Sequence, residues 1–224
     1  MEFFLDTANL EEIRTAQSWG ILDGVTTNPT LVAREGRDHK ALIQEICALV
    51  PGPVSVETTT ADAEGMVREG EVFATWAPNV VVKVPVTPEG IRAARALGAK
   101  GIPVNVTLVF SLPQALIAAK AGARFVSPFV GRLDDAGSDG MQVVRDICTA
   151  FAHYKFGTRV LAASLRHPVH VVQAALAGAQ VATMPFKVME QLFKHPMTDV
   201  GLERFLADAR RLAAELEARK TARV

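Results

Sequence analysis

A lysine interrupts an apolar run of the sequence, in a position that suits covalent chemistry. The run is VVVKVPV, from Val80 to Val86, and Lys83 is the charged residue in it. Side chains alternate between the two faces of a β-strand, so Lys83 shares a face with Val81 and Pro85. Burial favours the free amine, a nucleophile toward carbonyl groups, whereas neighbouring carboxylates favour the ammonium. The alternative is a lysine that extends from the strand end into solvent.

Two carboxylates also end short apolar runs. Asp6 follows Phe3–Leu5, and Glu57 closes Val54–Glu57. Two carboxyl groups with different neighbours can hold different pKa values, and one can then act as an acid while the other acts as a base. The alternative is that each carboxylate only neutralises Lys83 or Arg132 through a salt bridge.

Other polar side chains follow further apolar runs, and they suit a phosphorylated, polyhydroxylated ligand. Amide and hydroxyl groups both donate and accept hydrogen bonds, although asparagine is also common in tight turns. In AASLRH, Ser164 and Arg166 can bind a phosphate, and Arg132 in SPFVGR can add a second cation, unless the arginines only cover a rim. His167 and His170 stand at a helix start, where cap or surface positions are common, and we assign them no role. The amide and hydroxyl candidates are Thr26, Asn28, Asn105, Thr107 and Ser127.

The elements that must position these residues are eight short β-branched or aromatic runs, which alternate with amphipathic stretches. The runs are Phe3–Leu5, Gly24–Thr26, Val54–Glu57, Val80–Val84, Pro103–Thr107, Phe125–Ser127, Arg159–Ala162 and Val181–Thr183. This alternation predicts an α/β fold, a single (β/α)8 TIM barrel that makes residues 1–224 one domain. Active sites of such barrels lie at the carboxyl ends of the strands, so we expect the polar residues to meet there.

Helix boundaries in the sequence agree with this count of units. Three pairs predict helix starts, and glycines predict left-handed C-caps at helix ends. The starts are Asn9 with Glu12, Thr87 with Pro88, and Ser111 with Gln114; the glycines are Gly98, Gly101, Gly122 and Gly178. After the eighth run, residues 199–219 carry apolar side chains at helical spacing, which predicts an extra C-terminal helix. Periodicity leaves open whether its stripe packs on its own barrel or on a neighbouring subunit.

Composition excludes several classes of protein. Lysine plus arginine and aspartate plus glutamate both total 24 in 224 residues, so no net charge attracts nucleic acid or a membrane surface. Cys47 and Cys148 lie alone in apolar stretches, which favours reduced packing residues over a metal or redox site. No run approaches the roughly 20 apolar residues of a membrane span, and the amino terminus does not read as a signal peptide, so we expect a cytoplasmic protein.

The motifs, taken together, resemble a known family. They are FFLDTAN, GVTTNPTLV, VSVE, VVVKVP, NVTLVFS, VSPFVGRLDD and AASLRH, in this order. This set resembles the transaldolase family, specifically the short subfamily shared with fructose 6-phosphate aldolases. The resemblance extends from Met1 to about Leu212 and draws on seven of the eight predicted strand ends, so it is far more specific than any single motif.

The resemblance implies a class I mechanism that needs no metal or other cofactor. Lys83 forms a Schiff base with the ketose carbonyl, and Asp6 takes the proton of the C4 hydroxyl so that the C3–C4 bond breaks. Glu57, through a water positioned by Thr107, relays protons during formation of the Schiff base. The residues implied to hold the dihydroxyacetone unit are Asn28, Asn105 and Ser127; those implied to bind phosphate are Arg132, Ser164 and Arg166.

The resemblance also implies a reaction and an assembly. The family exchanges sedoheptulose 7-phosphate and glyceraldehyde 3-phosphate with erythrose 4-phosphate and fructose 6-phosphate, in the pentose phosphate pathway. Members of the short subfamily form homo-oligomeric pentamers or decamers in which the terminal helix crosses a neighbour.

Two other functions stay open at this point. One is a fructose 6-phosphate aldolase, which releases dihydroxyacetone; in those relatives a tyrosine replaces Phe129, the residue that should flank the enamine, and a glutamine replaces Glu57. The other is a non-catalytic sugar-phosphate-binding barrel in which Lys83 is an inert counter-ion.

Overall fold

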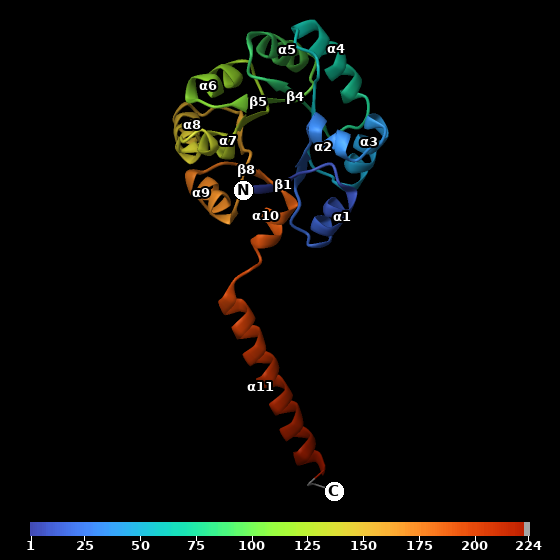
Figure 1. Ribbon diagram of the computed structural model, residues 1–224, viewed down its shortest axis with the longest axis vertical. Helices are drawn as coiled ribbons and strands as arrows, with labels where there is room; N and C mark the ends of the chain where they lie inside the picture. The colour runs from blue at the N-terminus through green and yellow to red at the C-terminus, as the bar shows by residue number, and fades with distance from the viewer. Residues whose placement is uncertain (222–224) are drawn as a thin grey trace. The chain divides into compact units, whose positions relative to one another are not determined.

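Eight parallel strands close into a barrel in the computed structural model, which describes residues 1–221 (Figure 1). The strands follow sequence order around the barrel, and β1 pairs with β8 to close it. They are β1 (Glu2–Asp6), β2 (Gly24–Thr26), β3 (Val54–Glu57), β4 (Val80–Pro85), β5 (Val104–Val109), β6 (Phe125–Pro128), β7 (Arg159–Ala162) and β8 (Val181–Met184). The predicted (β/α)8 fold and its eight strands are confirmed.

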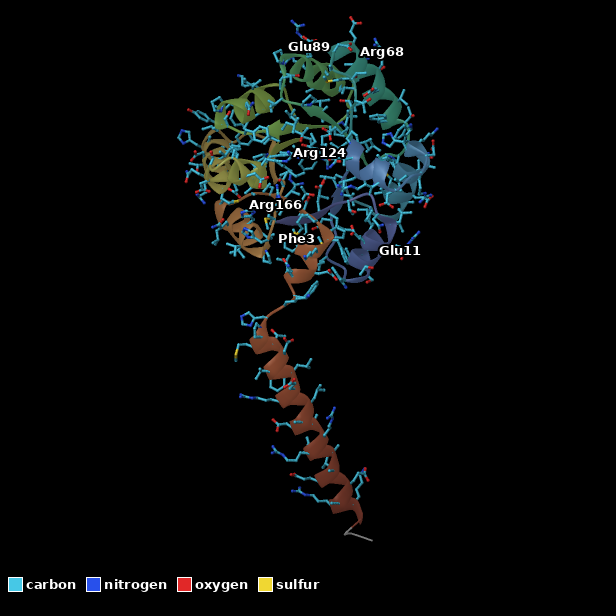
Figure 2. All side chains as sticks on the ribbon, in the orientation of Figure 1. Phe3, Glu11, Arg68, Glu89, Arg124 and Arg166 are labelled. Carbon is cyan, nitrogen blue, oxygen red and sulfur yellow. The ribbon has the colours of Figure 1, made fainter. Side chains whose placement is uncertain are left out.

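Helices surround the strands and present their charged side chains outward. They are α1 (Leu10–Ser18), α2 (Pro29–Arg34), α3 (His39–Leu49), α4 (Ala63–Ala74), α5 (Pro88–Ala99), α6 (Leu112–Lys120), α7 (Val130–Asp135), α8 (Gly140–Tyr154), α9 (Pro168–Ala177) and α10 (Phe186–Gln191). Glu11, Arg68 and Glu89 project from the outer helices (Figure 2). Glu11 pairs with Arg14 one turn along α1, so opposite charges neutralise each other locally.

The interior of the barrel is filled by apolar side chains from alternate positions of the strands. They are Phe4, Val81, Phe125, Leu161, Ala163 and Val181. Because Val81 is among them, Lys83 at the next alternate position of β4 also faces the barrel axis. The register places Glu57 of β3 and Asn105 of β5 directly beside Lys83. Three polar side chains therefore converge from neighbouring strands.

The helix caps follow the predictions in part. Asn9 caps α1 and accepts from the backbone N–H groups of Glu11 and Glu12, but the Glu12 carboxylate accepts from the hydroxyl of Thr7 and not from the backbone of Asn9. The carboxamide oxygen of Gln114 likewise accepts from the backbone N–H of Phe110. These two capping boxes are therefore only half formed.

The remaining cap predictions are confirmed except one. Thr87 caps α5 ahead of Pro88 by accepting from the N–H of Gly90. The C-cap of α9 is Gly178, at φ 86°, and Gly101 and Gly122 also have positive φ after their helices. The prediction for Gly98 is wrong, because α5 continues through it to Ala99.

Strand β5 is longer and less regular than predicted. It continues past Thr107 to Val109, and its pairing with β6 shifts register between Val106 and Val109. Leu108 lies within this irregularity at φ 57°, a left-handed conformation that is costly for a residue with a Cβ atom. The side chain of Leu108 is exposed.

The chain divides into two compact units, and the second begins at Glu190. The first unit, Met1–Met189, contains all eight strands. The second contains α11 (Pro196–Thr221), which is longer than the predicted 199–219 helix. Its apolar stripe is exposed, with Phe205 at 75% of its full accessibility. Within the described residues, no helix is long and apolar enough to span a membrane.

Candidate active site

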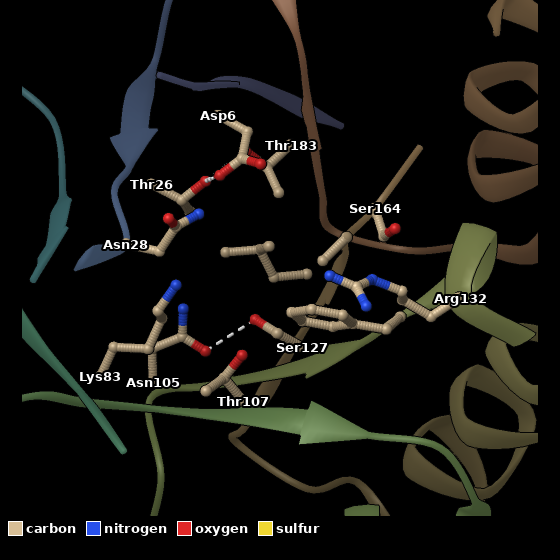
Figure 3. Close-up of a pocket in the computed structure, with 13 residues that line it drawn as sticks. Asp6, Thr26, Asn28, Lys83, Asn105, Thr107, Ser127, Arg132, Ser164 and Thr183 are labelled. Carbon is tan, nitrogen blue, oxygen red and sulfur yellow. Dashed lines mark hydrogen bonds between the residues drawn. The ribbon is translucent and has the colours of Figure 1, made fainter. Parts of the chain in front are cut away.

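A polar cavity lies at the carboxyl ends of the strands (Figure 3). Its lining residues are Asp6, Thr26, Asn28, Lys83, Asn105, Thr107, Ser127, Phe129, Arg132, Leu161, Ala163, Ser164 and Thr183. All site residues predicted from the sequence are in this set except Glu57 and Arg166. A second cavity shares Asn28, Lys83, Phe129 and Arg132 with the first, and Glu57 lines it.

Lys83 is buried in the barrel mouth and does not extend into solvent. The residue is 5% exposed, and its Nζ atom donates to the backbone oxygen of Thr27 at 2.7 Å. The same Nζ atom lies 3.0 Å from Oε2 of Glu57. A carboxylate is thus within direct proton-transfer distance of the amine, at a position fixed by the pairing of β3 with β4.

Asp6 sits in a different environment from Glu57, on β1, which is separated from β3 by the single strand β2. The hydroxyl of Thr26 donates to Oδ1 of Asp6 at 2.8 Å, and the oxygens of Thr26 and Thr183 are 2.7 Å apart. The single proton of Thr26 is used on Asp6, so Thr183 donates to Thr26. Burial raises the pKa of Asp6, while the positive charge of Lys83 and the Thr26 hydrogen bond act to lower it.

Asn105 and Ser127 form a fixed pair on β5 and β6. Asn105 is fully buried, its Nδ2 donates to Oγ of Ser55 at 3.2 Å, and its Oδ1 accepts from the Ser127 hydroxyl at 2.7 Å. With its proton committed to Asn105, the oxygen of Ser127 remains an acceptor toward the cavity. The pair therefore presents a ligand with an acceptor oxygen at Ser127.

Asn28 caps a helix and also lines the cavity. Its Oδ1 caps α2 by accepting from the backbone N–H of Leu31 at 2.9 Å. Capping uses the oxygen only, so the Nδ2 donor remains for a ligand, and the side chain lines the cavity. Thr107, on β5, has a buried Oγ1 without a hydrogen-bond partner among the described residues, and its side chain also lines the cavity.

The cationic side of the cavity lies across from Lys83. Arg132 of α7 and Ser164, which follows β7, lie together on this side (Figure 3). Arg166 lies outside the lining, and its Nη2 atom is 2.7 Å from Oδ2 of Asp135. Its side chain packs closely against α7: a Cβ atom added at Gly131 would lie only 2.4 Å from the Nε atom of Arg166.

Thr183 is the polar lining residue that sequence reasoning missed. It is 2% exposed on β8 and holds Thr26, which in turn contacts Asp6. The available signal was its position, because Thr183 is a polar residue near the end of the eighth apolar run, as Asp6 is at the end of the first. Its hydrogen bond to Thr26 joins β8 to β2 and forms only in the closed barrel, so the sequence does not reveal it.

The cysteines take no part in this site. Cys47 and Cys148 are both buried and unbonded, and burial raises the pKa of each thiol to about 11. They are packing residues, as predicted. Among residues 1–221, no group of three or more histidine, cysteine, aspartate or glutamate side chains could hold a metal ion.

Comparison with known proteins places the chain in a family. Residues 3–223 match the family model described as Transaldolase/Fructose-6-phosphate aldolase, so the chain belongs to this family. It is 63% identical over 208 residues to a protein of Aquifex aeolicus named "Probable transaldolase", covering 93% of this chain and 96% of the relative. A protein of Roseiflexus sp. with the same name is 62% identical over 209 residues, with the same coverage of both chains.

Solved structures of distant proteins share the fold. A thiamine phosphate pyrophosphorylase from Pyrococcus furiosus aligns with a TM-score of 0.59 at 18% identity, covering 85% of this chain and 93% of that one. A mandelate oxidase mutant aligns with a TM-score of 0.57 at 16% identity, over 83% of this chain and 64% of that one. These likenesses concern the barrel and not its chemistry.

Proposed function

We propose that this enzyme is a transaldolase that transfers a dihydroxyacetone unit between sugar phosphates through a Schiff base on Lys83. The observation that carries the proposal is the buried amine of Lys83, which faces a polar cavity and has the carboxylate of Glu57 at 3.0 Å. Family membership supports the same reaction. The setting that we propose is the pentose phosphate pathway of the cytoplasm, in a homo-oligomeric enzyme.

Formation of the Schiff base uses Lys83, Glu57 and Thr107. The Nζ atom attacks C2 of the ketose, and the carbinolamine then loses water to give the iminium. Glu57 is close enough to Nζ to accept and return the protons of these steps. The unpaired hydroxyl of Thr107 is available to orient the water that leaves.

Cleavage of the sugar uses Asp6. The carboxylate takes the proton of the C4 hydroxyl, the C3–C4 bond breaks, and its electrons move into the iminium to give an enamine. The aldose phosphate leaves, and the dihydroxyacetone unit stays on Lys83, held by Asn28, Asn105 and Ser127. An acceptor aldehyde then reverses these steps, with the proton on Asp6 returned to the new hydroxyl.

The cationic side of the cavity suits the phosphate that donor and acceptor share. Arg132 and Ser164 face Lys83 across the cavity, so a ketose bound at C2 directs its phosphorylated end toward them (Figure 3). In this proposal Arg166 adds its charge from beside α7. An arginine and a hydroxyl together satisfy several phosphate oxygens.

Borohydride trapping tests this proposal directly. Incubation with fructose 6-phosphate and borohydride is expected to attach a reduced sugar to Lys83, because hydride converts the iminium into a stable secondary amine, whereas a sugar bound non-covalently leaves no adduct. Peptide mass spectrometry locates the adduct, and Lys83→Met is the control that should acquire none. A label on another residue, or no label on the wild type, would refute the mechanism.

A further inference from the structure

His170 occupies a buried position at the start of α9, where the sequence suggested a cap or a surface residue. It is 7% exposed, so it is not a surface residue. Its Nδ1 atom accepts from the backbone N–H of Arg166 at 3.3 Å, and its Nε2 atom lies 3.1 Å from Oδ2 of Asp134 on α7. An accepting Nδ1 carries no proton, so the proton is on Nε2 and is donated to the carboxylate. Both nitrogen atoms are satisfied in the neutral ring.

The two segments that His170 joins are the two that carry the phosphate-binding residues. Backbone N–H groups of Val130 and Gly131 donate to the carbonyl oxygens of Ala163 and Ser164, at 3.0 and 2.9 Å. The contact is close enough to require glycine, because a Cβ atom at Gly131 would lie 2.4 Å from the oxygen of Ser164. Helix α7, which carries Arg132, is therefore in direct contact with the loop between β7 and α9.

The loop needs support from outside itself. Ser164 has φ 57°, a conformation that costs a non-glycine residue free energy and persists only where neighbours hold it. The backbone of Arg166, two residues later, is held by His170. Asp134, the partner of His170 on α7, is itself held in place, because its Oδ1 accepts from the N–H of Gly140 at the start of α8. His170 thus links this loop to both α7 and α8.

We propose that neutral His170 is a positioning residue for phosphate binding, which holds the loop of Ser164 and Arg166 against α7 so that these residues and Arg132 form one anion site. The proposal rests on the proposed function, since it assigns the sugar phosphate to this side of the cavity. His170 does not line the cavity and acts only through the residues it holds.

Protonation of His170 is expected to release the loop. A proton on Nδ1 would face the N–H of Arg166, and two donors cannot share a hydrogen bond. The groups around the ring are His167 and Arg166 of the loop and α9, Asp134 of α7, and Asp139 at the N-cap of α8. Burial lowers the pKa of His170, assisted by His167 and Arg166 and opposed by the two aspartates. The neutral form of His170 therefore persists to more acidic pH than that of an ordinary histidine. Phosphate binding is expected to weaken when the pH falls below the lowered pKa of His170.

Two variants separate the two bonds of His170. In His170→Asn the amide oxygen can stand near Nδ1 and accept from the N–H of Arg166, whereas in His170→Gln the amide nitrogen can stand near Nε2 and donate to Asp134. Loss of the loop bond in His170→Gln is expected to raise KM for glyceraldehyde 3-phosphate by about tenfold, with kcat and the KM for unphosphorylated glyceraldehyde little changed. His170→Asn should retain most of the affinity and lose its dependence on acid pH. The matched control is His153→Asn, on the exposed surface of α8.

Binding of inorganic phosphate, followed by ³¹P NMR, gives a readout that does not require Lys83 chemistry. We expect the same order of affinity, with wild type and His170→Asn above His170→Gln. Equal phosphate affinity in all three proteins, or KM changes equal for both aldehydes, would overturn the proposal for His170. A failure of borohydride trapping at Lys83 would instead overturn the Schiff-base reaction, and the phosphate titration would still decide the role of His170.

Discussion

Asp6 and Glu57 illustrate how one barrel gives two carboxylates different environments. Glu57 is the immediate neighbour of Lys83 across a strand pair, at 3.0 Å from the amine. Asp6 accepts a hydrogen bond from the hydroxyl of Thr26 and lies near the positive charge of Lys83, and burial raises its pKa. A base with a raised pKa binds the proton of a sugar hydroxyl more readily, which suits the cleavage step that we assign to it.

The Thr26 hydroxyl is one of the groups that influence the pKa of Asp6, and the direction of its effect can be tested. The bond from Thr26 stabilises the carboxylate and so lowers the pKa of Asp6. Thr26→Val should raise that pKa, and the acid limb of kcat/KM for fructose 6-phosphate should move to higher pH. Thr183→Val is the graded control, because Thr183 only polarises Thr26 and its loss should shift the limb less in the same direction. An unmoved limb in Thr26→Val would show that Asp6 is not the base.

Phe129 is the residue expected to separate transfer from hydrolysis of the enamine. It lines the cavity, and its ring meets Phe110 edge to face at 5.9 Å. A phenyl ring offers no proton to the enamine, whereas a phenol does. Phe129→Tyr should therefore increase free dihydroxyacetone from fructose 6-phosphate and lower transfer to erythrose 4-phosphate, as measured by product analysis. A variant with an unchanged product ratio would leave Phe129 a packing residue, and a wild type that releases as fast as it transfers would be an aldolase.

At the scale of elements, the strands were predictable because each is a short β-branched or aromatic run that is largely buried in the barrel wall. The polar residues at the strand ends were predictable because burying a charged side chain such as Lys83 or Asp6 deep in the barrel is costly, whereas the barrel mouth is polar. Features that depend on contacts between elements were not predictable. The burial of His170 against α7 and the bond from Thr183 to Thr26 join residues far apart in the sequence. The carboxylate of Glu12 likewise accepts from the hydroxyl of Thr7 and not from the backbone N–H of Asn9. The path of the chain just before α1 determines which of these donors lies within its reach.

The irregular end of β5 is a local feature with a testable energetic sign. Leu108 at φ 57° is strained by its Cβ atom, so glycine should be preferred over alanine there. We expect Leu108→Gly to be more stable than Leu108→Ala by about 1 kcal/mol in the free energy of unfolding. At Val106, a regular position of the same strand, Gly should instead be less stable than Ala by about 0.5–1 kcal/mol. Guanidinium denaturation of the four variants measures both differences, and the same order at both positions would contradict the assigned strain.

At the scale of the whole molecule, the barrel unit contains the complete candidate site, and α11 raises a separate question. Its exposed apolar residues, which lie at helical spacing, are Leu202, Phe205, Leu206, Leu212 and Leu216. Single exposed apolar residues are ordinary, but a stripe along one helix face indicates a surface that another surface covers. We therefore expect α11 to mediate assembly of subunits, as the resemblance to the short subfamily implies.

Deletion of residues 199–224 tests this expectation, because it leaves every strand of the barrel in place. The truncated protein should have a smaller mass than the full chain in light scattering after size exclusion, and Lys83 should still be trapped by borohydride. Phe205→Glu should reduce the mass in the full-length chain, because it places a charge in the apolar stripe. Ala207→Glu, on the opposite face of α11, carries the same added charge and should leave the mass unchanged. If the truncated protein and Phe205→Glu both elute as the full-length assembly does, the stripe packs within its own subunit, and assembly uses another surface.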